Sequence, residues 1–440
     1  MAVGFPLTNI LSDRTRRLGK EGLWVVIGQG MAVLGSLIGV RLLTEALDPT
    51  AYGELALGMT VATLVNQTIL GPLGVGAIRF YAPARESADF GGYLRAVRAL
   101  AMQATALIVS MWVVSLGVLS VAHHPRWNAL TTASLAFAVV SGYNAILNGI
   151  QNAARQRSIV ALHQGIESWA RYLIAASFVA LLGASSALAM VGYVVSGVLI
   201  LVSQLLFFRK IGSQSAIREV RGIGAARKID WRDGIWKFSW PISIFGIFTW
   251  GQLASDRWAL GLLTSTRDVG MYSALLQLGY YPVSMATGVA VQFLTPILFQ
   301  RVGDASDAGR NAKARHLTWR LTAVALALTG AAFIVTFALH AQIFRMLVAR
   351  EYGGISYLLP WMILAGGIFA AAQVTGLNLM SQMKTRKIMV AKIATSLVGI
   401  ALSFAGARWL GVKGIVIATL TFSTLYFLAI AWLSRREGLV

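Results

Sequence analysis

Long apolar runs alternate with short polar segments along almost the whole chain. The runs lie near residues 22–44, 52–79, 96–121, 129–152, 158–182, 187–208, 236–263, 269–298, 318–339, 355–380, 388–406 and 412–433. A helix that crosses a membrane needs about 20 mostly apolar residues, and nearly every run has this length. The pattern therefore predicts an all-α, polytopic membrane protein with about twelve transmembrane helices.

The composition removes several classes of protein. Of the 440 residues, 57% are hydrophobic and only 12% are charged, whereas soluble domains carry about 25% charged residues. So little charge cannot cover a water-facing surface, which excludes a large soluble catalytic domain. The absence of cysteine excludes disulfides and thiol-bound metals. The first apolar run has no small-residue cleavage pattern behind it, so we expect it to remain as a span.

Basic residues are in large excess. The chain carries 38 Lys and Arg against 17 Asp and Glu, a net charge of +21. In a membrane protein this excess collects in cytoplasmic loops, so we expect no nucleic-acid partner. With the N-terminus inside, 28 basic residues fall in inside segments and six fall in outside loops, namely Arg126, Arg267, Arg345, Arg350, Arg408 and Lys413. The bias predicts that both termini are cytoplasmic.

The longest break between runs, residues 209–235, divides the chain into two similar halves. "RLLTEALDPTAYGELAL" (41–57) matches "RWALGLLTSTRDVGMYSAL" (257–275), which aligns Arg41 with Arg257 and Gly53 with Gly270. "NGIQNAARQRSIVA" (148–161) likewise matches "NLMSQMKTRKIMVA" (378–391). Both matches fall at equivalent spans, as in a parallel repeat. We therefore predict a six-helix lobe over 1–208, a basic cytoplasmic linker over 209–235, a second lobe over 236–440, and a central cleft.

These segments resemble a known family. The stretch 41–55, "GPLGVGAIRFYA" (71–82), "SDRWALGLLTSTRDVGMYSAL" (255–275) and "RWLGVKGIVIATL" (408–420) are similar to Wzx-type polysaccharide and O-antigen flippases of the multidrug/oligosaccharidyl-lipid/polysaccharide flippase superfamily. The resemblance implies transport of a polyprenyl-(pyro)phosphate-linked oligosaccharide across the bacterial inner membrane by alternating access, for lipopolysaccharide or exopolysaccharide synthesis. It also implies contacts with membrane lipids, and a polysaccharide polymerase and other assembly proteins as candidate partners.

No motif indicates an enzyme. None of the five histidines has HExxH spacing, and there is no phosphate-binding GxxxxGK[ST] loop. Membrane polysaccharide polymerases and ligases are the enzymatic alternative, but they usually carry a large external loop, and the longest external loop here is about 340–354. We therefore expect a protein that is not an enzyme and needs no metal or cofactor.

Charged residues inside spans are the main candidates for function, because a charge at bilayer depth costs about 2.5 kcal/mol or more unless it is paired or hydrated. Arg41 and Arg257 are predicted to face the cleft, where a guanidinium fork suits a pyrophosphate. The alternative for Arg41 is a pair with Glu45 or a reach to headgroups. For Asp256, coupling to a cation competes with structural pairing.

Two further groups are candidates. Glu167 and Arg171 lie one turn apart on the fifth span, where they form either a buried pair or a polar stripe in the cleft in which Glu167 takes up a proton. Arg79 ends the second span on the cytoplasmic side, where it either receives a diphosphate or anchors to lipid phosphate. Arg41, Arg79, Arg171 and Arg257 are thus the predicted substrate-binding residues, and Asp256 and Glu167 the predicted ion-coupling residues.

The charge of these residues bears on the cargo. A cation-coupled multidrug exporter of the same superfamily is the closest alternative, and it would need acids in the cleft. Deep basic residues outnumber deep acids in this sequence, which favours an anionic cargo. A scaffold for polysaccharide assembly is the third hypothesis.

The charge bias predicts the topology directly. A reporter fused after residue 220 should lie in the cytoplasm, and one inserted near residue 185 should lie outside. In the cysteine-free background, Ala184→Cys should react with a membrane-impermeant thiol reagent in intact cells. An unreactive cysteine at this site, in protein that has reached the membrane, would overturn the orientation.

Overall fold

The computed structural model describes residues 7–219, 229–302 and 307–436, and within these ranges all regular structure is helical. The elements are α1 (Leu7–Ala46), α2 (Pro49–Val65), η1 (Asn66–Leu70), α3 (Gly71–Glu86), α4 (Phe90–Val121), α5 (Arg126–Ala153), α6 (Arg157–Leu182), α7 (Ser186–Glu219), α8 (Trp231–Leu263), α9 (Thr266–Leu275), η2 (Leu276–Tyr280), α10 (Tyr281–Val302), α11 (Ala308–Leu347), η3 (Arg350–Leu358), α12 (Leu359–Ser381) and α13 (Thr385–Arg436).

The helices occupy the predicted runs. All twelve apolar ranges fall within described helical segments. In the described part of the chain, nine helical segments are long and apolar enough to cross a membrane. One of them contains two predicted spans, because α13 turns at Gly411, where φ is +57°. The backbones of Gly406 and Gly414 then meet on either side of this turn, as in an antiparallel hairpin. The predicted spans at 236–263 and 269–298 are not among the nine. The prediction of an all-α, multi-pass membrane protein is confirmed.

Two helices are interrupted in the same way. The π-helical turns η1 and η2 stand two residues before Pro72 and Pro282, respectively. A proline inside a helix lacks an N–H and collides with the carbonyl four residues back. These carbonyls belong to Thr68 and Leu278, the central residues of the two π turns. The wider turns therefore relieve the collision at matching places in the two halves.

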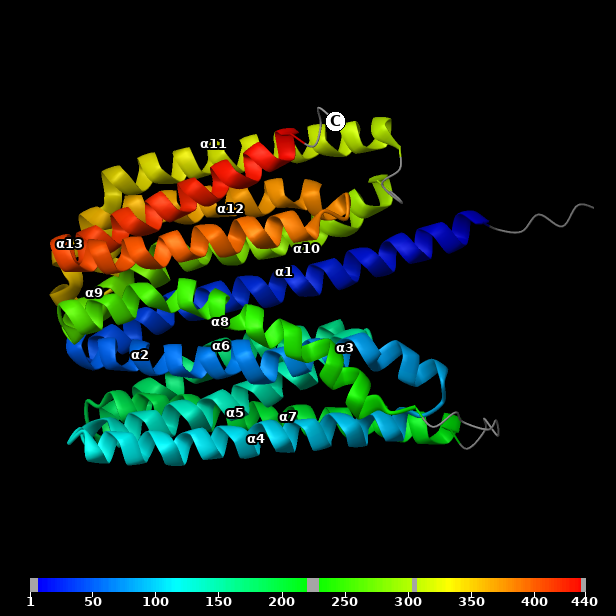
Figure 1. The fold of residues 1–440 in the computed structure, drawn as a ribbon, viewed down its shortest axis with the longest axis horizontal. Coiled ribbons are helices and arrows are strands. Elements are labelled where there is room, and N and C mark those ends of the chain that lie inside the picture. Colours follow the sequence, from blue (N-terminus) through cyan, green and yellow to red (C-terminus); the bar gives the residue numbers. More distant parts are fainter. Residues whose placement is uncertain (1–6, 220–228, 303–306, 437–440) are drawn as a thin grey trace, which may run out of the picture.

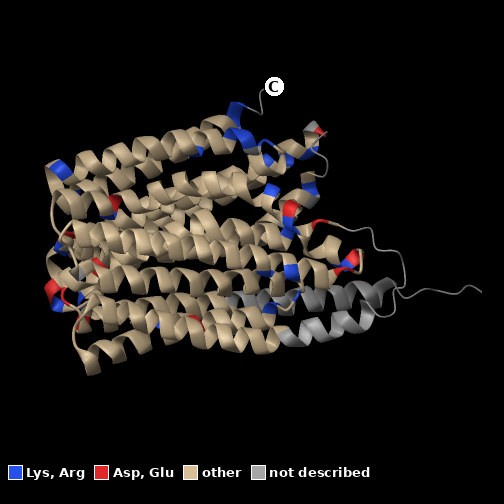
Figure 2. Cartoon of the chain, turned by 60° about the horizontal axis from the view of Figure 1, so that its bottom comes forward, with Lys and Arg blue, Asp and Glu red and all other residues tan. Residues whose placement is uncertain are grey.

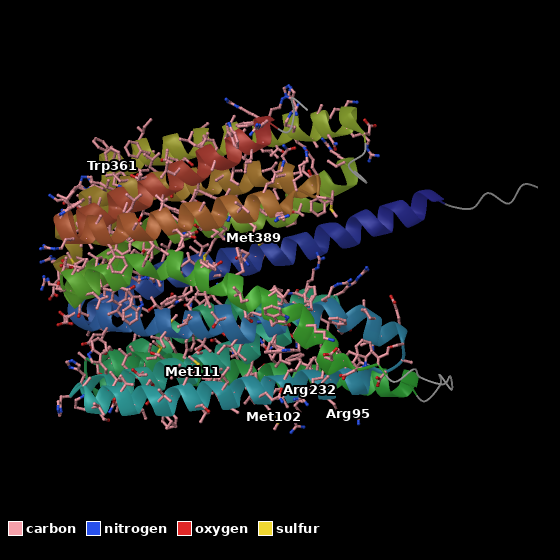
Figure 3. All side chains as sticks on the ribbon, in the orientation of Figure 1. Arg95, Met102, Met111, Arg232, Trp361 and Met389 are labelled. Atoms are coloured by element: carbon pink, nitrogen blue, oxygen red, sulfur yellow. The ribbon has the colours of Figure 1, made fainter. Side chains whose placement is uncertain are left out.

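The bundle presents apolar side chains outwards. Figure 2 shows that Lys, Arg, Asp and Glu gather at the two ends, and that few lie along the middle. Helix α4 is the clearest case, since Met102 and Val114 are 59% and 66% exposed. Met102 and Met111 are both labelled on this helix in Figure 3. An apolar face of this extent fits lipid as its surroundings.

The helices form two groups with α1 and α8 between them. In Figure 1, α4, α5 and α7 lie at the bottom, α10 to α13 lie at the top, and α1 and α8 run between. The start of α1 and the end of α13 both point to the right in Figure 1, and we call this end inner after the predicted orientation. The opposite end, where α2 and α9 begin, is called outer.

Equivalent hydrogen bonds support the internal repeat. Gln204 donates through Nε2 to Asn148 Oδ1 (3.1 Å), and Asn378 donates through Nδ2 to Ser434 Oγ (2.8 Å). The partners are 56 residues apart in both pairs. Asn148 and Asn378 are also aligned by the sequence match. The two halves thus join their fourth and sixth predicted spans at the same depth.

The glycines aligned by the repeat touch each other. Gly53 lies four residues into α2, and Gly270 lies four residues into α9. A Cβ atom on Gly53 would stand 2.8 Å from the Gly270 nitrogen, and one on Gly270 would stand 3.0 Å from the Gly53 nitrogen. Such a contact between equivalent positions is expected where a pseudo-two-fold axis passes. It closes the outer end between the two halves.

The predicted linker is partly helical. Helix α7 continues to Glu219 and α8 begins at Trp231, while residues 220–228 lie outside the described ranges. The start of α8 packs on the first half of the chain, where the Trp231 indole donates to Asp89 Oδ2 (2.7 Å). Helix α8 therefore connects the halves as well as opening the second.

Gly53→Ala tests the close contact at the outer end. The added Cβ would lie 2.0 Å from the Thr266 carbonyl oxygen, so α2 and α9 must separate. Overpacking of this kind costs about 1–3 kcal/mol, and we expect a lower apparent melting temperature in detergent. Gly117→Ala is the matched control, because nothing lies within 4 Å of its Cβ position. Equal melting temperatures for the two variants would contradict the contact.

Candidate functional site

The candidate site lies along the seam where α8 crosses α2, η1 and α3. Near the middle of this seam a Cβ on Gly246 would meet the Gln67 carbonyl oxygen of η1 at 2.0 Å, so only glycine fits. Farther toward the inner end, a Cβ on Gly76 of α3 would meet the side chain of Ser239. Glycines thus allow close packing of α8 at two places along the seam.

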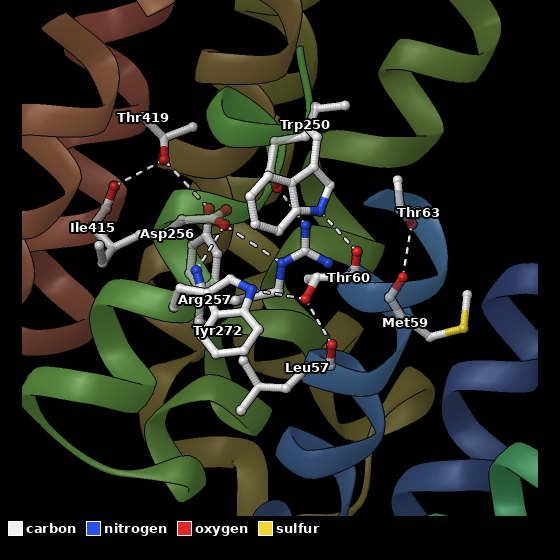
Figure 4. A network of polar contacts seen from close by, with 12 residues as sticks. Leu57, Met59, Thr60, Thr63, Trp250, Asp256, Arg257, Tyr272, Ile415 and Thr419 are labelled. Carbon is white, nitrogen blue, oxygen red and sulfur yellow. Dashed lines mark hydrogen bonds and ion pairs between the residues drawn. The ribbon is translucent and has the colours of Figure 1, made fainter. Parts of the chain in front are cut away.

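Two tryptophans of α8 donate hydrogen bonds to one threonine of α2. The Trp250 indole donates to the Thr60 carbonyl oxygen (2.7 Å), and the Trp258 indole donates to Thr60 Oγ1 (2.9 Å). The Thr60 hydroxyl in turn donates to the Leu57 carbonyl oxygen (2.6 Å). Figure 4 shows this network between α8 and α2. Both indole N–H groups therefore bind across the seam.

Arg257 lies beside this network. Its side chain is buried and extends from α8 toward Trp250 and Thr60 (Figure 4). Nε lies 3.4 Å from Asp256 Oδ1, and an Nη2 hydrogen bond reaches the Leu253 carbonyl oxygen. A fully ionised guanidinium has five N–H donors, so these two contacts leave donors for a further anion. That Arg257 faces a cleft between the halves stays a prediction.

Asp256 contacts Arg257 and also borders a cavity. It lines a small cavity of about 40 Å³ inside the second half, together with Tyr272, Tyr280, Tyr281 and Thr419. This volume has room for about three water molecules. Asp256 Oδ1 accepts from the Arg257 backbone N–H (2.7 Å). Successive residues on a helix point about 100° apart, so Asp256 reaches this cavity while its carboxylate still contacts Arg257.

Arg41 is placed at the outer end. It pairs with Glu45 and donates to the carbonyl oxygens of Arg345 (3.1 Å) and Val348 at the end of α11. The pair with Glu45 is the alternative that the sequence left open. Carbonyls at a helix C-terminus lack intrahelical partners and attract a cation. Arg41 thus joins α1 to the second half of the chain.

Glu167 and Arg171 lie within the first half, between α6 and α7. The Arg171 guanidinium stands over the rings of Tyr172 (5.0 Å) and Tyr193 (5.4 Å). His163 bonds Ser203 Oγ through Nε2 (3.0 Å). Among the described ion pairs none joins Glu167 to Arg171. The two residues share a helix face, as predicted, but Arg171 is held by aromatic rings.

Arg79 lies apart from the other candidates. It is exposed near the inner end of α3, in line with the exposed Val75 and Ile78. The structure therefore distributes the predicted residues over four places, and only Asp256 and Arg257 are in contact. Within the described ranges no three His, Asp or Glu side chains come together as a metal site.

Thr60, Gln67 and Gly246 were missed by the sequence analysis. A threonine, a glutamine and a glycine in apolar helices carry no distinctive pattern, and their partners are more than 170 residues away in the chain. No signal in one sequence could have paired them.

Solved structures with the same fold are transporters of one superfamily. An inward-facing multidrug resistance MATE family transporter of the MOP superfamily aligns with a TM-score of 0.69 and 12% identity over 93% of this chain and 94% of that one. The lipid II flippase MurJ, in an inward closed conformation, also gives 0.69, with 11% identity over 94% and 87%. An outward-facing MATE transporter gives 0.55, with 13% identity over 95% and 94%.

The family is established by sequence. No curated protein matches this chain significantly. Residues 18–302, well over half of the chain, match the family described as polysaccharide biosynthesis protein. This match confirms the family that the sequence motifs indicated. The chain is a multi-pass membrane protein with the MATE and MurJ fold, and it belongs to the polysaccharide biosynthesis protein family.

Proposed function

We propose that this protein is a flippase that carries a polyprenyl-(pyro)phosphate-linked oligosaccharide from the cytoplasmic to the outer face of the bacterial inner membrane. It would do so with twelve spans in two six-helix lobes, α1–α7 and α8–α13, that rock about a central cleft. The protein is then a transporter and not an enzyme, both termini are cytoplasmic, and it supplies surface polysaccharide synthesis such as O-antigen or exopolysaccharide assembly.

The observation that carries the proposal is the buried pair of neighbouring residues Asp256 and Arg257 on α8, whose side chains are in contact. Arg257 extends toward the seam between the halves, and Asp256 also lines a small cavity within the second half. A cation at the seam suits an anionic head that passes between the lobes. An acid that lines a small cavity suits a proton or sodium ion that drives the movement. Helix α8 would then couple the movement of the cargo to the binding of the driving ion.

The free-energy cost of moving a sugar head through hydrocarbon explains why such a cargo needs a carrier. Each polar group of a sugar head that enters hydrocarbon without a partner costs several kcal/mol. A hydrated cleft avoids this cost, while the polyprenyl tail stays in lipid. A membrane potential that is negative inside favours outward movement of the head, by roughly 4.6 kcal/mol per 100 mV for two charges.

The closed outer end fits an inward-facing state of this cycle. Gly53 and Gly270 touch there, and Arg41 binds the end of α11. The fold also aligns better with the inward-facing MATE transporter than with the outward-facing one. Opening outwards requires these contacts to break, so Arg41 would meet the head only after it releases the α11 carbonyls. Arg79 would bind the head group at the inner opening of the cleft. Within the first lobe, Arg171 would bind the substrate and Glu167 would take up the coupling ion.

A cation-coupled multidrug exporter is the second candidate. The same TM-score of 0.69 for the MATE transporter and for the lipid II flippase keeps this function open. The family match to polysaccharide biosynthesis proteins and the basic residue at the seam favour the flippase. Sensitivity to drugs in a deletion strain with intact surface polysaccharide would favour the exporter.

Arg257→Ala should abolish rescue of a flippase-deficient strain while the protein level holds. Arg257→Lys should rescue only in part, because a lysine ammonium cannot bind two phosphate oxygens in the bidentate way that a planar guanidinium does. The matched control is Arg408→Ala, which removes an exposed arginine at the outer end and should export normally. Normal polysaccharide export by an Arg41→Ala, Arg257→Ala double variant would end the anionic-cargo proposal.

Asp256→Asn should make transport insensitive to the driving cation gradient, because the group that loads the cation is gone. Flipping in proteoliposomes would be measured with the pH gradient, the sodium gradient and the potential imposed separately. Glu351→Gln, an exposed acid at the outer end, is the control and should keep the wild-type response. If wild type follows only the potential, or if Asp256→Asn keeps its gradient dependence, the coupling role is wrong.

A further inference from the structure

A groove of about 730 Å³ opens between the two arms of α13 at the inner end of the bundle. All of its lining residues belong to α13, namely Arg386, Lys387, Val390, Ala391, Ala429, Trp432, Leu433 and Arg436. The arms touch at Gly406 and Gly414 near their turn, and they stand apart at their inner ends. The groove is the space that this divergence leaves.

The groove is basic at its mouth. Arg386, Lys387 and Arg436 lie within the terminal six residues of the two arms, and none of the lining residues is acidic. The Arg436 guanidinium stands 5.1 Å from the centre of the Trp432 ring. This contact holds one charge against the groove wall, with its remaining donors available to a ligand. In Figure 2, Lys and Arg mark this end of the bundle beside the C-terminus.

The walls below these charges are apolar and open to the surroundings. Val390 and Trp432 are 59% and 57% exposed, and Ala391, Ala429 and Leu433 complete the surface. The groove therefore has three cations at its mouth and an apolar wall beneath them. An inner-leaflet lipid has the same order, with phosphate at the interface and acyl chain beneath.

We propose that this groove binds an anionic diacyl phospholipid of the inner leaflet. The phosphate lies among Arg386, Lys387 and Arg436, and one acyl chain lies against Val390, Leu433 and Trp432. Three cations without a lining acid select a net negative headgroup over a zwitterionic one, because a choline or ethanolamine ammonium has no carboxylate to pair with.

The position of the groove separates it from the transport cleft. The opposite side of the first arm of α13 packs on α8, where Lys392 Nζ stands 5.7 Å from the Phe245 ring and Ile400 lies against Gly251. No helix of the first half contributes to the lining. The ligand is therefore a resident membrane phospholipid and not the transported lipid, and the inference does not depend on the proposed function.

Lipid binding to the purified full-length protein tests the proposal by native mass spectrometry. Phosphatidylglycerol should bind in preference to phosphatidylcholine, and undecaprenyl phosphate should not displace it. A basic residue at an anionic lipid surface contributes about fivefold in affinity. Arg386→Gln with Arg436→Gln should therefore weaken phosphatidylglycerol binding about 25-fold.

The matched control is Arg95→Gln with Arg98→Gln, which removes two exposed arginines near the start of α4. This helix belongs to the first half of the chain, and its start lies at the inner end of the bundle, as the groove does. Arg95 projects from α4 in Figure 3, far from α13. This control should leave phosphatidylglycerol affinity unchanged. An equal loss in the control would show only diffuse attraction to basic surface and overturn the site. Equal binding of phosphatidylcholine, or displacement by undecaprenyl phosphate, would overturn the identity of the ligand.

Discussion

The structure depends on close approach of helix backbones in surroundings that supply no hydrophobic force between helices. Lipid chains are as apolar as leucine, so association in a membrane needs tight packing and hydrogen bonds between helices. Glycine provides the approach at the places that matter most. Gly53 and Gly270 join the halves at the outer end, Gly246 seats α8 on η1, and Gly406 meets Gly414 in α13. Each contact joins one pair of helix segments.

Hydrogen bonds fix the depth at which these helices meet. A polar group in hydrocarbon cannot hydrogen-bond to water, so it needs a hydrogen-bond partner within the protein. Thr60 takes both indole N–H groups of Trp250 and Trp258, which sets the register of α8 against α2. The pairs at Asn148 and Asn378 do the same inside each half. Small backbone contacts thus determine distance, and a few polar pairs determine register.

The two halves share a plan but differ in how they use charge. Arg41 and Arg257 are aligned in sequence, yet Arg41 binds the carbonyls of another helix end and Arg257 lies beside an acid of its own helix. The difference follows from their neighbours, because α1 ends beside α11, whereas α8 crosses α2 in the middle of the bundle. An internal repeat therefore preserves backbone geometry at Gly53 and Gly270 while it frees equivalent side chains for separate roles.

Hydrophobic patterning determined the class of this protein, because a run of 20 apolar residues has one stable form in a membrane. The repeat marked which positions are equivalent, such as Gly53 and Gly270. The sequence also identified the family, since its motifs are spread over most of the chain. It could not show that Asp256 lines a cavity beside Arg257, that Trp250 and Trp258 share Thr60, or that the ends of α13 leave a basic groove. These features depend on which helices become neighbours, and that choice is made by side-chain packing between segments far apart in the chain, which periodicity within one segment does not encode.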